Sequence, residues 1–266
     1  MKKVLTVQDL SCLGKCSLTV ALPVLSAMGC SCSVLPTAVL STHTAFPHPH
    51  VRSLTADMAP ICDHWKTIGA EFDAISIGYL SDPAQTAAVE HLLNTFPTMV
   101  VLDPVLGDHG QLYTGMTQDH VQAMKSLCRR ANVLLPNVTE ACLLTDTPYE
   151  ENPGDAFFRA LLEKLRTFGA DTVVITGYCL TPGTTGYLGW DKTSGEFSRA
   201  VPKIPKSCHG TGDLFAAVLT GSLLANPPAA AAEKAASFVE TVLQTSQETP
   251  FGLSFEKHLK QLTVDS

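Results

Sequence analysis

The residues with the clearest chemical potential form the run Gly210-Thr211-Gly212-Asp213, directly before an apolar stretch at 214–219 that is typical of a buried helix. A tight glycine turn at a helix start presents unpaired backbone N–H groups and the positive end of the helix dipole, so it can bind an anion. A carboxylate there repels the anion unless it accepts a proton from a nucleophile that attacks it, which indicates phosphoryl transfer. The alternative is that Asp213 is only an N-cap, and the four residues alone do not separate the two.

A second acid, Asp103, stands at the end of an apolar run at 99–103, where it could orient water bound to Mg²⁺. The stretch that follows, from Gly107 to Tyr113, is predicted to be a mobile flap. Asp108 within it is expected to face solvent. These residues favour a metal-nucleotide site beside a movable cover.

Asn137 and Glu140 follow another apolar run and stand three positions apart. That is the spacing of a helix capping pair, so local structure alone could explain it. The same spacing also directs a carboxylate toward the end of the preceding strand, where a metal-bound nucleotide would lie. Both interpretations stay open.

The run 8–16, which contains Asp9, Gly14 and Cys16, is close to a phosphate-binding P-loop. A P-loop needs glycine in place of Asp9 and serine or threonine in place of Cys16. An acid at this position would repel phosphate but could accept a hydrogen bond from a polar ring. A plain turn or cap residue is the equally weighted alternative.

Two groups of residues that could bind a metal, the cysteines and the histidines, are not expected to do so. The nine cysteines include no CxxC pair and lie mostly in apolar runs, which favours reduced, buried thiols over a cluster or disulfides. His43, His48 and His50 are separated by prolines, so a joint metal site is not expected.

The elements that must position these residues follow a β-α pattern. Predicted strands are 4–8, 32–35, 74–78, 99–103, 133–136 and 172–176, and predicted helices are 18–28, 54–66, 84–95, 117–130, 141–144 and 155–168. An antiparallel hairpin is expected at 187–190 and 197–201, followed by the glycine turn, its helix and an Ala-rich helix at 228–247. Strands of this kind form a parallel sheet covered on both faces, with ligands at the carboxyl ends of the strands.

Composition limits the class of ligand. The 266 residues are 45% hydrophobic and 16% charged, with a formal net charge of −7 and no run of Lys or Arg. We therefore expect a single folded domain over residues 1–266, small-molecule ligands, and neither a nucleic-acid nor a membrane partner. No apolar stretch has the length of a membrane span, and the first residues lack a signal-peptide core, so a cytoplasmic protein is expected.

Taken together, five motifs in this order resemble the ribokinase-like vitamin kinases, and above all the pyridoxal (pyridoxine, pyridoxamine) kinases. The motifs are His43-Thr44, Gly78-Tyr79, Asp-Pro-Val-Leu-Gly-Asp at 103–108, Pro-Asn-x-x-Glu at 136–140, and the glycine turn with Asp213. The resemblance implies a three-layer α/β/α fold with a mostly parallel central sheet and a minimal lid. It also implies an ATP- and Mg²⁺-dependent homodimer that phosphorylates the hydroxymethyl group of a B6 vitamer; it leaves the preferred vitamer and any monovalent cation open.

By the same resemblance each motif has an expected role. Asp213 matches the catalytic base, and Gly210, Thr211 and Gly212 match the anion hole. The resemblance places Asp103 and Glu140 near Mg²⁺ and the triphosphate. The other expected contacts are Asn137, Thr176 and Gly177 on the nucleotide side, and Asp9, His43, Thr44, Gly78, Tyr79 and Tyr113 on the substrate side. Asp9 departs from the family pattern, which has serine there, and we hypothesise that it pairs with the ring nitrogen or the phenolic hydroxyl.

Three rival functions remain. In hydroxymethylpyrimidine kinases the family pattern at the turn is Gly-Thr-Gly-Cys. This chain has Asp213 where their cysteine would be, which favours the pyridoxal kinases. Sugar and nucleoside kinases share the aspartate but usually have an early Gly-Gly-Asn-type loop and a separate lid, which this chain lacks. A vitamer sensor without activity is disfavoured by intact Asp213, Asp103 and Glu140.

Overall fold

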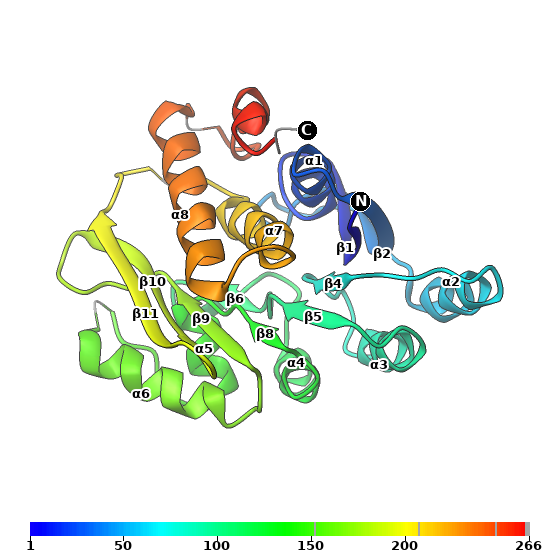
Figure 1. The fold of residues 1–266 in the computed structure, drawn as a ribbon, viewed down its shortest axis with the longest axis horizontal. Helices are drawn as coiled ribbons and strands as arrows, with labels where there is room; N and C mark the ends of the chain where they lie inside the picture. Colours follow the sequence, from blue (N-terminus) through cyan, green and yellow to red (C-terminus); the bar gives the residue numbers. More distant parts are fainter. Residues whose placement is uncertain (152, 207, 248, 264–266) are drawn as a thin grey trace.

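A nine-stranded sheet forms the middle layer of the computed structural model, which describes residues 1–151, 153–206, 208–247 and 249–263 (Figure 1). Its strand order is β11-β10-β9-β8-β5-β4-β1-β2-β3. The strands are β1 (Lys3–Leu13), β2 (Ser31–Thr42), β3 (Val51–Ser53), β4 (Ala74–Ile77), β5 (Met99–Leu102), β8 (Val133–Leu134), β9 (Thr172–Thr176), β10 (Thr184–Asp191) and β11 (Gly195–Pro202). Neighbours from β9 to β2 pair in parallel, whereas β10, β11 and β3 pair antiparallel.

Helices cover both faces of this sheet, so the predicted three-layer α/β/α fold is confirmed (Figure 1). One face packs against α2 (Thr55–Thr67), α3 (Gln85–Thr95), α4 (Gln118–Cys128), α5 (Val138–Leu144) and α6 (Asp155–Arg166). The other face packs against α1 (Leu18–Ala27), α7 (Thr211–Leu223), α8 (Pro228–Thr245) and the 3₁₀ helix η1 (Glu256–Gln261). The sheet therefore separates two apolar cores.

The apolar spacing along each helix explains which face it buries. In α6, the buried residues Phe158, Leu161, Leu162 and Leu165 follow the three- and four-residue steps of one helix stripe. Helix α7 is buried along most of its length because it lies between α1 and α8. Alanines on α8 that face this layer have no exposed surface, and their small side chains allow close approach of the two helices.

The first two strands are longer than expected. The sequence predicts strands at 4–8 and 32–35, but β1 continues to Leu13 and β2 to Thr42. The second predicted strand stops just before Pro36, and proline cannot donate a backbone hydrogen bond to a sheet. In the structure Pro36 pairs with Gln8 at a register shift between Gln8 and Leu10, where the missing donor is tolerated. Asp9 consequently lies within β1 and not in a loop after it, which corrects the sequence interpretation.

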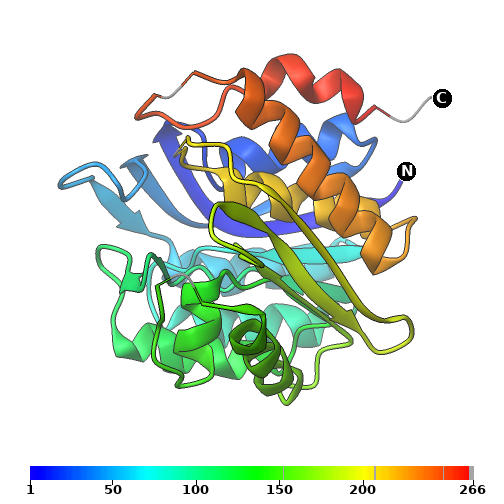
Figure 2. The same cartoon turned by 90° about the vertical axis from the view of Figure 1, so that its left-hand side faces the viewer.

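Four short elements were not predicted. They are the edge strand β3, the small hairpin of β6 (Gly107–Asp108) and β7 (Gln111–Leu112), and η1. Each is too short to show a periodic apolar pattern. Figure 2 shows the extended ends of β1 and β2 and the β6–β7 hairpin at the same edge of the molecule, on the left of that view. This is the carboxyl-end edge of the parallel strands.

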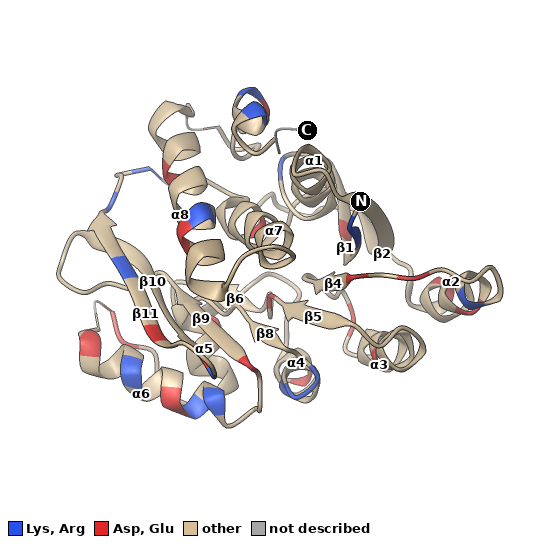
Figure 3. Ribbon diagram, in the orientation of Figure 1, with Lys and Arg blue, Asp and Glu red and all other residues tan. Residues whose placement is uncertain are grey.

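Charged residues are distributed over the outer elements. Figure 3 shows Lys and Arg on several separate helices and loops. Arg159 on α6 is ion-paired with Asp155 and also with Glu196 of β11, which ties the helix to the hairpin. Within the described ranges, no helix combines the length and apolar character needed to cross a bilayer.

Candidate active site

The N-terminus of α7 has the geometry expected of an anion-binding turn. Gly210 is its N-cap in the left-handed conformation, with φ of 87°, and a Cβ there would lie 2.2 Å from the carbonyl oxygen of Lys15. Only glycine accepts both conditions. Thr211, Gly212 and Asp213 then form the first turn, whose N–H groups have no partner inside the helix. Asp213 is therefore a first-turn residue and not the cap, so the N-cap interpretation is wrong.

The Asp213 carboxyl group is partly exposed at this edge and has a strongly altered ionisation. Burial raises its pKa to about 6, and the negative charge of Asp9 contributes to the rise. The backbone N–H of Ser17 donates a hydrogen bond to the carboxylate and opposes that rise. A carboxylate with a pKa near neutrality is better matched to proton abstraction than one at its ordinary value.

Asp9 lies at the bulge of β1 and is 3% exposed. Ser11 Oγ donates a hydrogen bond of 2.9 Å to its Oδ2 atom. Burial raises the pKa of Asp9, while the hydroxyl groups of Ser17 and Ser11 lower it as hydrogen-bond donors. Burial and the charge of Asp9 raise the pKa of the neighbouring Tyr79 to about 12. The Asp9 carboxyl group at the bulge thus interacts with the hydroxyl groups of Ser11 and Ser17 and with Tyr79.

His43 is buried at the start of the loop after β2, with Thr44 half-buried beside it. Its Nε2 atom lies 2.8 Å from the carbonyl oxygen of Pro250. Its ring lies 4.6 Å from the ring of His209 and 4.8 Å from that of Phe46, measured between centroids. The resemblance places this loop near the vitamer ring. In the structure the loop contacts both the glycine turn, through His209, and the C-terminal segment around Pro250.

Gly78, a glycine predicted on the substrate side, follows β4 and packs closely on β1. A Cβ at Gly78 would lie 3.1 Å from the side chain of Gln8. The next residue, Tyr79, is held through its carbonyl oxygen, which accepts a 2.8 Å hydrogen bond from Thr37 Oγ1. The lack of a side chain at Gly78 therefore lets the chain after β4 pass close to Gln8 of β1.

Asp103 and Glu140 lie close enough to repel each other, and Asp103 also interacts with Asp213. Burial and this repulsion raise the pKa of both Asp103 and Glu140 well above their ordinary values. The Tyr113 hydroxyl is affected by the same acids. Burial is the largest cause that raises its pKa, and the negative charges of Glu140, Asp108, Asp103 and Asp213 raise it further. The structure thus brings the predicted metal-side acids and the flap tyrosine together with Asp213.

The capping interpretation of Asn137 and Glu140 is confirmed. Asn137 Oδ1 accepts from the Glu140 N–H at 3.0 Å, and Glu140 Oε2 accepts from the Asn137 N–H at 2.8 Å. Glu140 Oε1 accepts from the Leu106 N–H, and Asn137 Nδ2 donates to the Gly107 carbonyl at 2.9 Å. Both side chains therefore fix the start of α5 and the base of the β6–β7 hairpin at once.

The expected nucleotide-side residues of β9 are beside this pair. Thr176 forms a parallel bridge with Asn137, and its N–H donates to the Pro136 carbonyl at 2.9 Å. Gly177 follows with φ of 77° and is exposed. Asn137, Thr176 and Gly177 are thus adjacent at the carboxyl ends of β8 and β9.

A metal site made by the protein alone is not present in the described part of the chain, since no three His, Cys, Asp or Glu side chains there are arranged to bind one ion. The buried acids are nevertheless compatible with Mg²⁺, which proteins usually hold through one or two carboxylates together with substrate phosphates and water. Asp103 fits such a ligand better than Glu140, because both Glu140 oxygens already accept backbone N–H groups.

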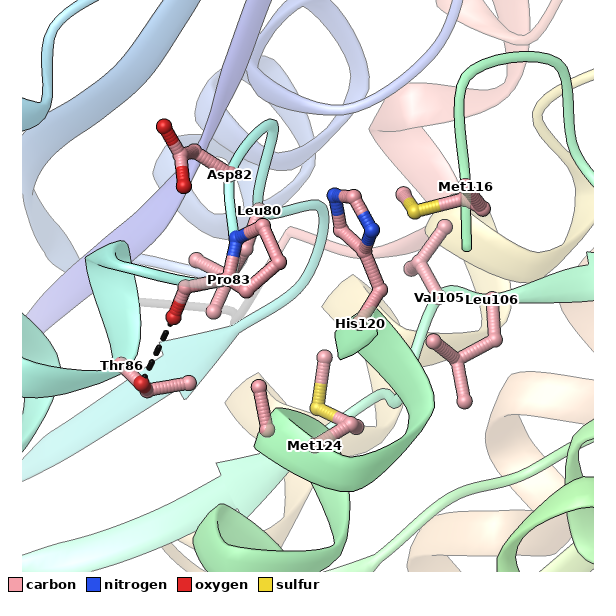
Figure 4. A pocket seen from close by; sticks show the side chains of 10 residues that line it. Leu80, Asp82, Pro83, Thr86, Val105, Leu106, Met116, His120 and Met124 are labelled. Carbon is pink, nitrogen blue, oxygen red and sulfur yellow. Dashed lines mark hydrogen bonds between the residues drawn. The ribbon is translucent and has the colours of Figure 1, made fainter. Parts of the chain in front are cut away.

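A separate small pocket with a volume of about 10 Å³ lies beside the loop that leads from Asp103 to the hairpin (Figure 4). Val105, Leu106, Met116 and Met124 line it, together with His120. Among the described residues His120 Nε2 has no hydrogen-bond partner, whereas its Nδ1 accepts from the Thr117 N–H at the start of α4. None of the predicted site residues lines this cavity.

Sequence reasoning missed Ser17 and His209. Ser17 stands at the start of α1, where serine is an ordinary cap, so nothing in the sequence distinguished it. Its backbone has φ of 49°, which a sequence does not reveal for a residue other than glycine. His209 is next to the glycine turn, but its stacking on His43 depends on the packing of distant loops.

Comparisons with known proteins identify the family of this chain. Residues 22–255 match a family model described as phosphomethylpyrimidine kinase. A pyridoxine/pyridoxal/pyridoxamine kinase of Bordetella avium is 31% identical, with 88% of this chain and 81% of that protein aligned.

Two crystal structures are also similar. One, from Bacteroides thetaiotaomicron in a form with pyridoxal, is 36% identical and has a TM-score of 0.93, covering 98% of this chain and 95% of that one. The other, pyridoxal kinase from Lactobacillus plantarum, is 34% identical with a TM-score of 0.89, covering 98% and 96%.

Proposed function

The chain belongs to the phosphomethylpyrimidine kinase family, and from that premise we propose how its residues phosphorylate a B6 vitamer. The protein is a kinase whose acceptor is the hydroxymethyl group of pyridoxal, pyridoxine or pyridoxamine. The observation that most directly supports this chemistry is the position of Asp213 in the first turn of α7, directly behind an anion-binding glycine turn. Asp9 and Asp103 lie on the same edge of the sheet.

The reaction is a direct displacement. The hydroxymethyl oxygen of the vitamer attacks the terminal phosphorus of ATP, and the Asp213 carboxylate accepts the hydroxyl proton. A new oxygen–phosphorus bond forms while the bond to the bridging oxygen breaks, and ADP leaves. The N–H groups of Thr211 and Gly212 stabilise the charge on the transferred group, because they are fixed before the reaction and point out of the helix start.

Asp103, with Glu140 behind it, would hold Mg²⁺ on the phosphate side. Two mutually repelling buried carboxyl groups are stabilised in their charged forms when a divalent cation lies beside them. Bound there, Mg²⁺ would neutralise charge on the nucleotide phosphates. Asn137, Thr176 and Gly177 form the nucleotide side of the same edge.

Asp9 binds the vitamer ring in this proposal, through the ring nitrogen or the phenolic hydroxyl. A buried carboxyl group with hydroxyl donors on one side can accept one further hydrogen bond from a polar ring. His43 and Thr44 complete that side from the loop after β2, and Tyr79 from the end of β4. Tyr113 covers the site from the β6–β7 hairpin.

The second candidate activity is hydroxymethylpyrimidine phosphorylation, which the name of the family model favours. Hydroxymethylpyrimidine kinases have a cysteine at the turn, where this chain has Asp213, and this difference favours the B6 vitamers as substrates. A panel of pyridoxal, pyridoxine, pyridoxamine and hydroxymethylpyrimidine with Mg·ATP separates the two. We expect turnover with at least one B6 vitamer, and turnover of hydroxymethylpyrimidine alone would overturn the assignment.

The Asp213→Asn variant tests the base. Amide replacement keeps the size and one hydrogen-bond acceptor but removes the basic oxygen, so kcat should fall about 10²–10⁴-fold. Nucleotide binding, measured by calorimetry, should be retained. A variant with kcat close to the wild-type value would contradict the role of Asp213.

Three further properties are part of the proposal. They are the use of Mg·ATP as phosphoryl donor, assembly as a homodimer, and a cytoplasmic location. The first is supported by the acid pair at Asp103 and Glu140. Assembly as a homodimer comes from the family resemblance, whereas the cytoplasmic location is the expectation drawn from the sequence.

A further inference from the structure

Ser17 is an N-cap residue that does not use its side chain to cap its helix. Its carbonyl oxygen accepts from the N–H groups of Val20 and Ala21 at 3.0 and 2.9 Å, as a cap residue should. Its hydroxyl group makes no hydrogen bond to the first turn of α1. Serine is favoured at this position because its oxygen normally accepts from that turn. The Ser17 hydroxyl is therefore available for another partner.

The backbone of Ser17 is also held in an unfavourable conformation. Its φ of 49° and ψ of −126° lie in a region of backbone conformation that residues other than glycine rarely adopt. Such conformations persist where the surrounding structure enforces them, and they occur often at functional sites. Ser17 is 6% exposed, so its orientation is fixed by packing and not by solvent.

The surrounding loops explain that enforcement. The Lys15 N–H donates to the Phe251 carbonyl at 2.7 Å, and the Lys15 carbonyl lies against Gly210 so closely that no side chain fits between them. Gly252 approaches the same carbonyl oxygen, and a Cβ added at Gly252 would lie 2.8 Å from it. Two distant segments, the glycine turn at Gly210 and residues 251–252, thus fix the chain immediately before Ser17.

In this orientation Ser17 faces both acids of the site. Its hydroxyl group donates toward the Asp9 carboxyl group, and its backbone N–H donates toward the Asp213 carboxyl group. Asp9 and Asp213 repel each other, so each needs a donor to stay charged and directed. One residue therefore lies between the acid that meets the ring and the acid that takes the proton.

We propose that Ser17 is a positioning residue for this kinase: its hydroxyl orients the Asp9 carboxylate for the vitamer ring, while its strained backbone directs an N–H at Asp213. The inference rests on the proposed function of the site. The hydroxyl acts through Asp9, so its loss should weaken vitamer binding and leave the chemical step largely intact. The backbone N–H remains in any side-chain variant, so the effect of the hydroxyl on Asp9 can be measured separately from the effect of the N–H on Asp213.

The decisive variant is Ser17→Ala, which removes the hydroxyl and keeps the Cβ and the N–H. We expect the KM for the vitamer to rise about tenfold or more, since a hydrogen bond to a charged group is lost. The value of kcat should change less than about threefold, and the KM for ATP should be unchanged. Ser26→Ala, an exposed serine on the same helix, is the matched control and should leave all three constants at their wild-type values.

A double-mutant cycle with Asp9→Asn separates action through Asp9 from a general structural effect. If Ser17 works through Asp9, Ser17→Ala should change the vitamer KM by less than about twofold in the Asp9→Asn background. Full additivity of the two effects would overturn the proposal, and so would a wild-type KM in Ser17→Ala. Ser17→Gly removes the same hydroxyl while relieving the strained φ, so it should melt no lower than wild type yet show the raised KM.

These outcomes are distinguishable from failure of the proposed function. If wild-type protein phosphorylates no B6 vitamer, the assignment of the site fails before any variant is compared. If wild-type protein is active but Ser17→Ala and Ser26→Ala have the same vitamer KM, only the role of Ser17 is contradicted.

Discussion

At the scale of single residues, the ionisation of Asp213 decides whether the vitamer hydroxyl can lose its proton. The pKa of about 6, above the ordinary value of 3.8, places the change from protonated to charged form within the experimentally accessible range. Only the charged form is a base. Activity should therefore be complete above this pKa and decrease as the pH falls through it.

We expect kcat/KM for pyridoxine to fall about tenfold per pH unit below about pH 6. The measurement is an initial-rate series between pH 5 and 8 at saturating Mg·ATP. A profile that stays level down to pH 5 would show that another group accepts the proton.

The same pKa gives the sign of an effect on stability, which also serves as a folding control for Asp213→Asn. Because the folded-state pKa is raised, ionisation of Asp213 opposes folding as the pH rises from about 4 through about 6. The variant should therefore melt above wild type at pH 8, and the difference should vanish near pH 4. Thermal melts without nucleotide or metal measure this difference.

At the scale of elements, the two glycines of the α7 turn have different tasks. Gly210 has a left-handed backbone and no room for a side chain, whereas a Cβ at Gly212 would have nothing within 4 Å. The first glycine is required by the fold. The second leaves open space at the helix start, where the phosphate is expected.

Gly210→Ala should lower the free energy of unfolding by about 2 kcal/mol or more, because a strained φ is combined with a clash against the Lys15 carbonyl. Gly212→Ala should match or exceed wild-type stability, since alanine favours a helix, yet lose about tenfold or more in kcat/KM as its methyl group meets the phosphate. Urea unfolding and steady-state kinetics on both variants test the contrast. Equal stability of the two would contradict it.

At the scale of the whole molecule, the C-terminal segment closes the second core and contacts the active-site loops. Phe255 has no exposed surface, and Leu253 and Leu262 join the same core as α1, α7 and α8. The neighbouring Phe251 is 43% exposed and contacts the ring of Phe46. Residues 251–262 are therefore needed both for stability and for the position of the loop that contains His43.

Phe255→Ala should lower the free energy of unfolding by about 3–5 kcal/mol, as expected for removing a fully buried aromatic ring. Phe251→Ala is the matched control, and its effect should stay within about 1 kcal/mol because much of the ring is already in water. Chemical unfolding monitored by circular dichroism measures both. A Phe255→Ala variant as stable as its control would mean that this segment does not complete the core.

The sequence alone determined the features that depend on neighbouring residues. The alternation of strands and helices, the Asn137–Glu140 capping pair and the helix after the glycine turn follow from apolar spacing and local hydrogen bonds, which act within one or two turns. The strand at 172–176 was predicted with its observed bounds, and the hairpin after it was predicted in kind. The ordered motifs also pointed to the family before any coordinates.

Only the tertiary structure decided where the acids lie and what they contact. Asp9 lies inside β1 because Gln8 and Leu10 pair with β2 across a register shift. Ser17 meets Asp9 and Asp213 because Lys15 is fixed by Gly210 and by the C-terminal segment. Burial and the approach of like charges, which raise the pKa values of these acids, arise only when crossover connections bring separate strand ends to one edge of the sheet.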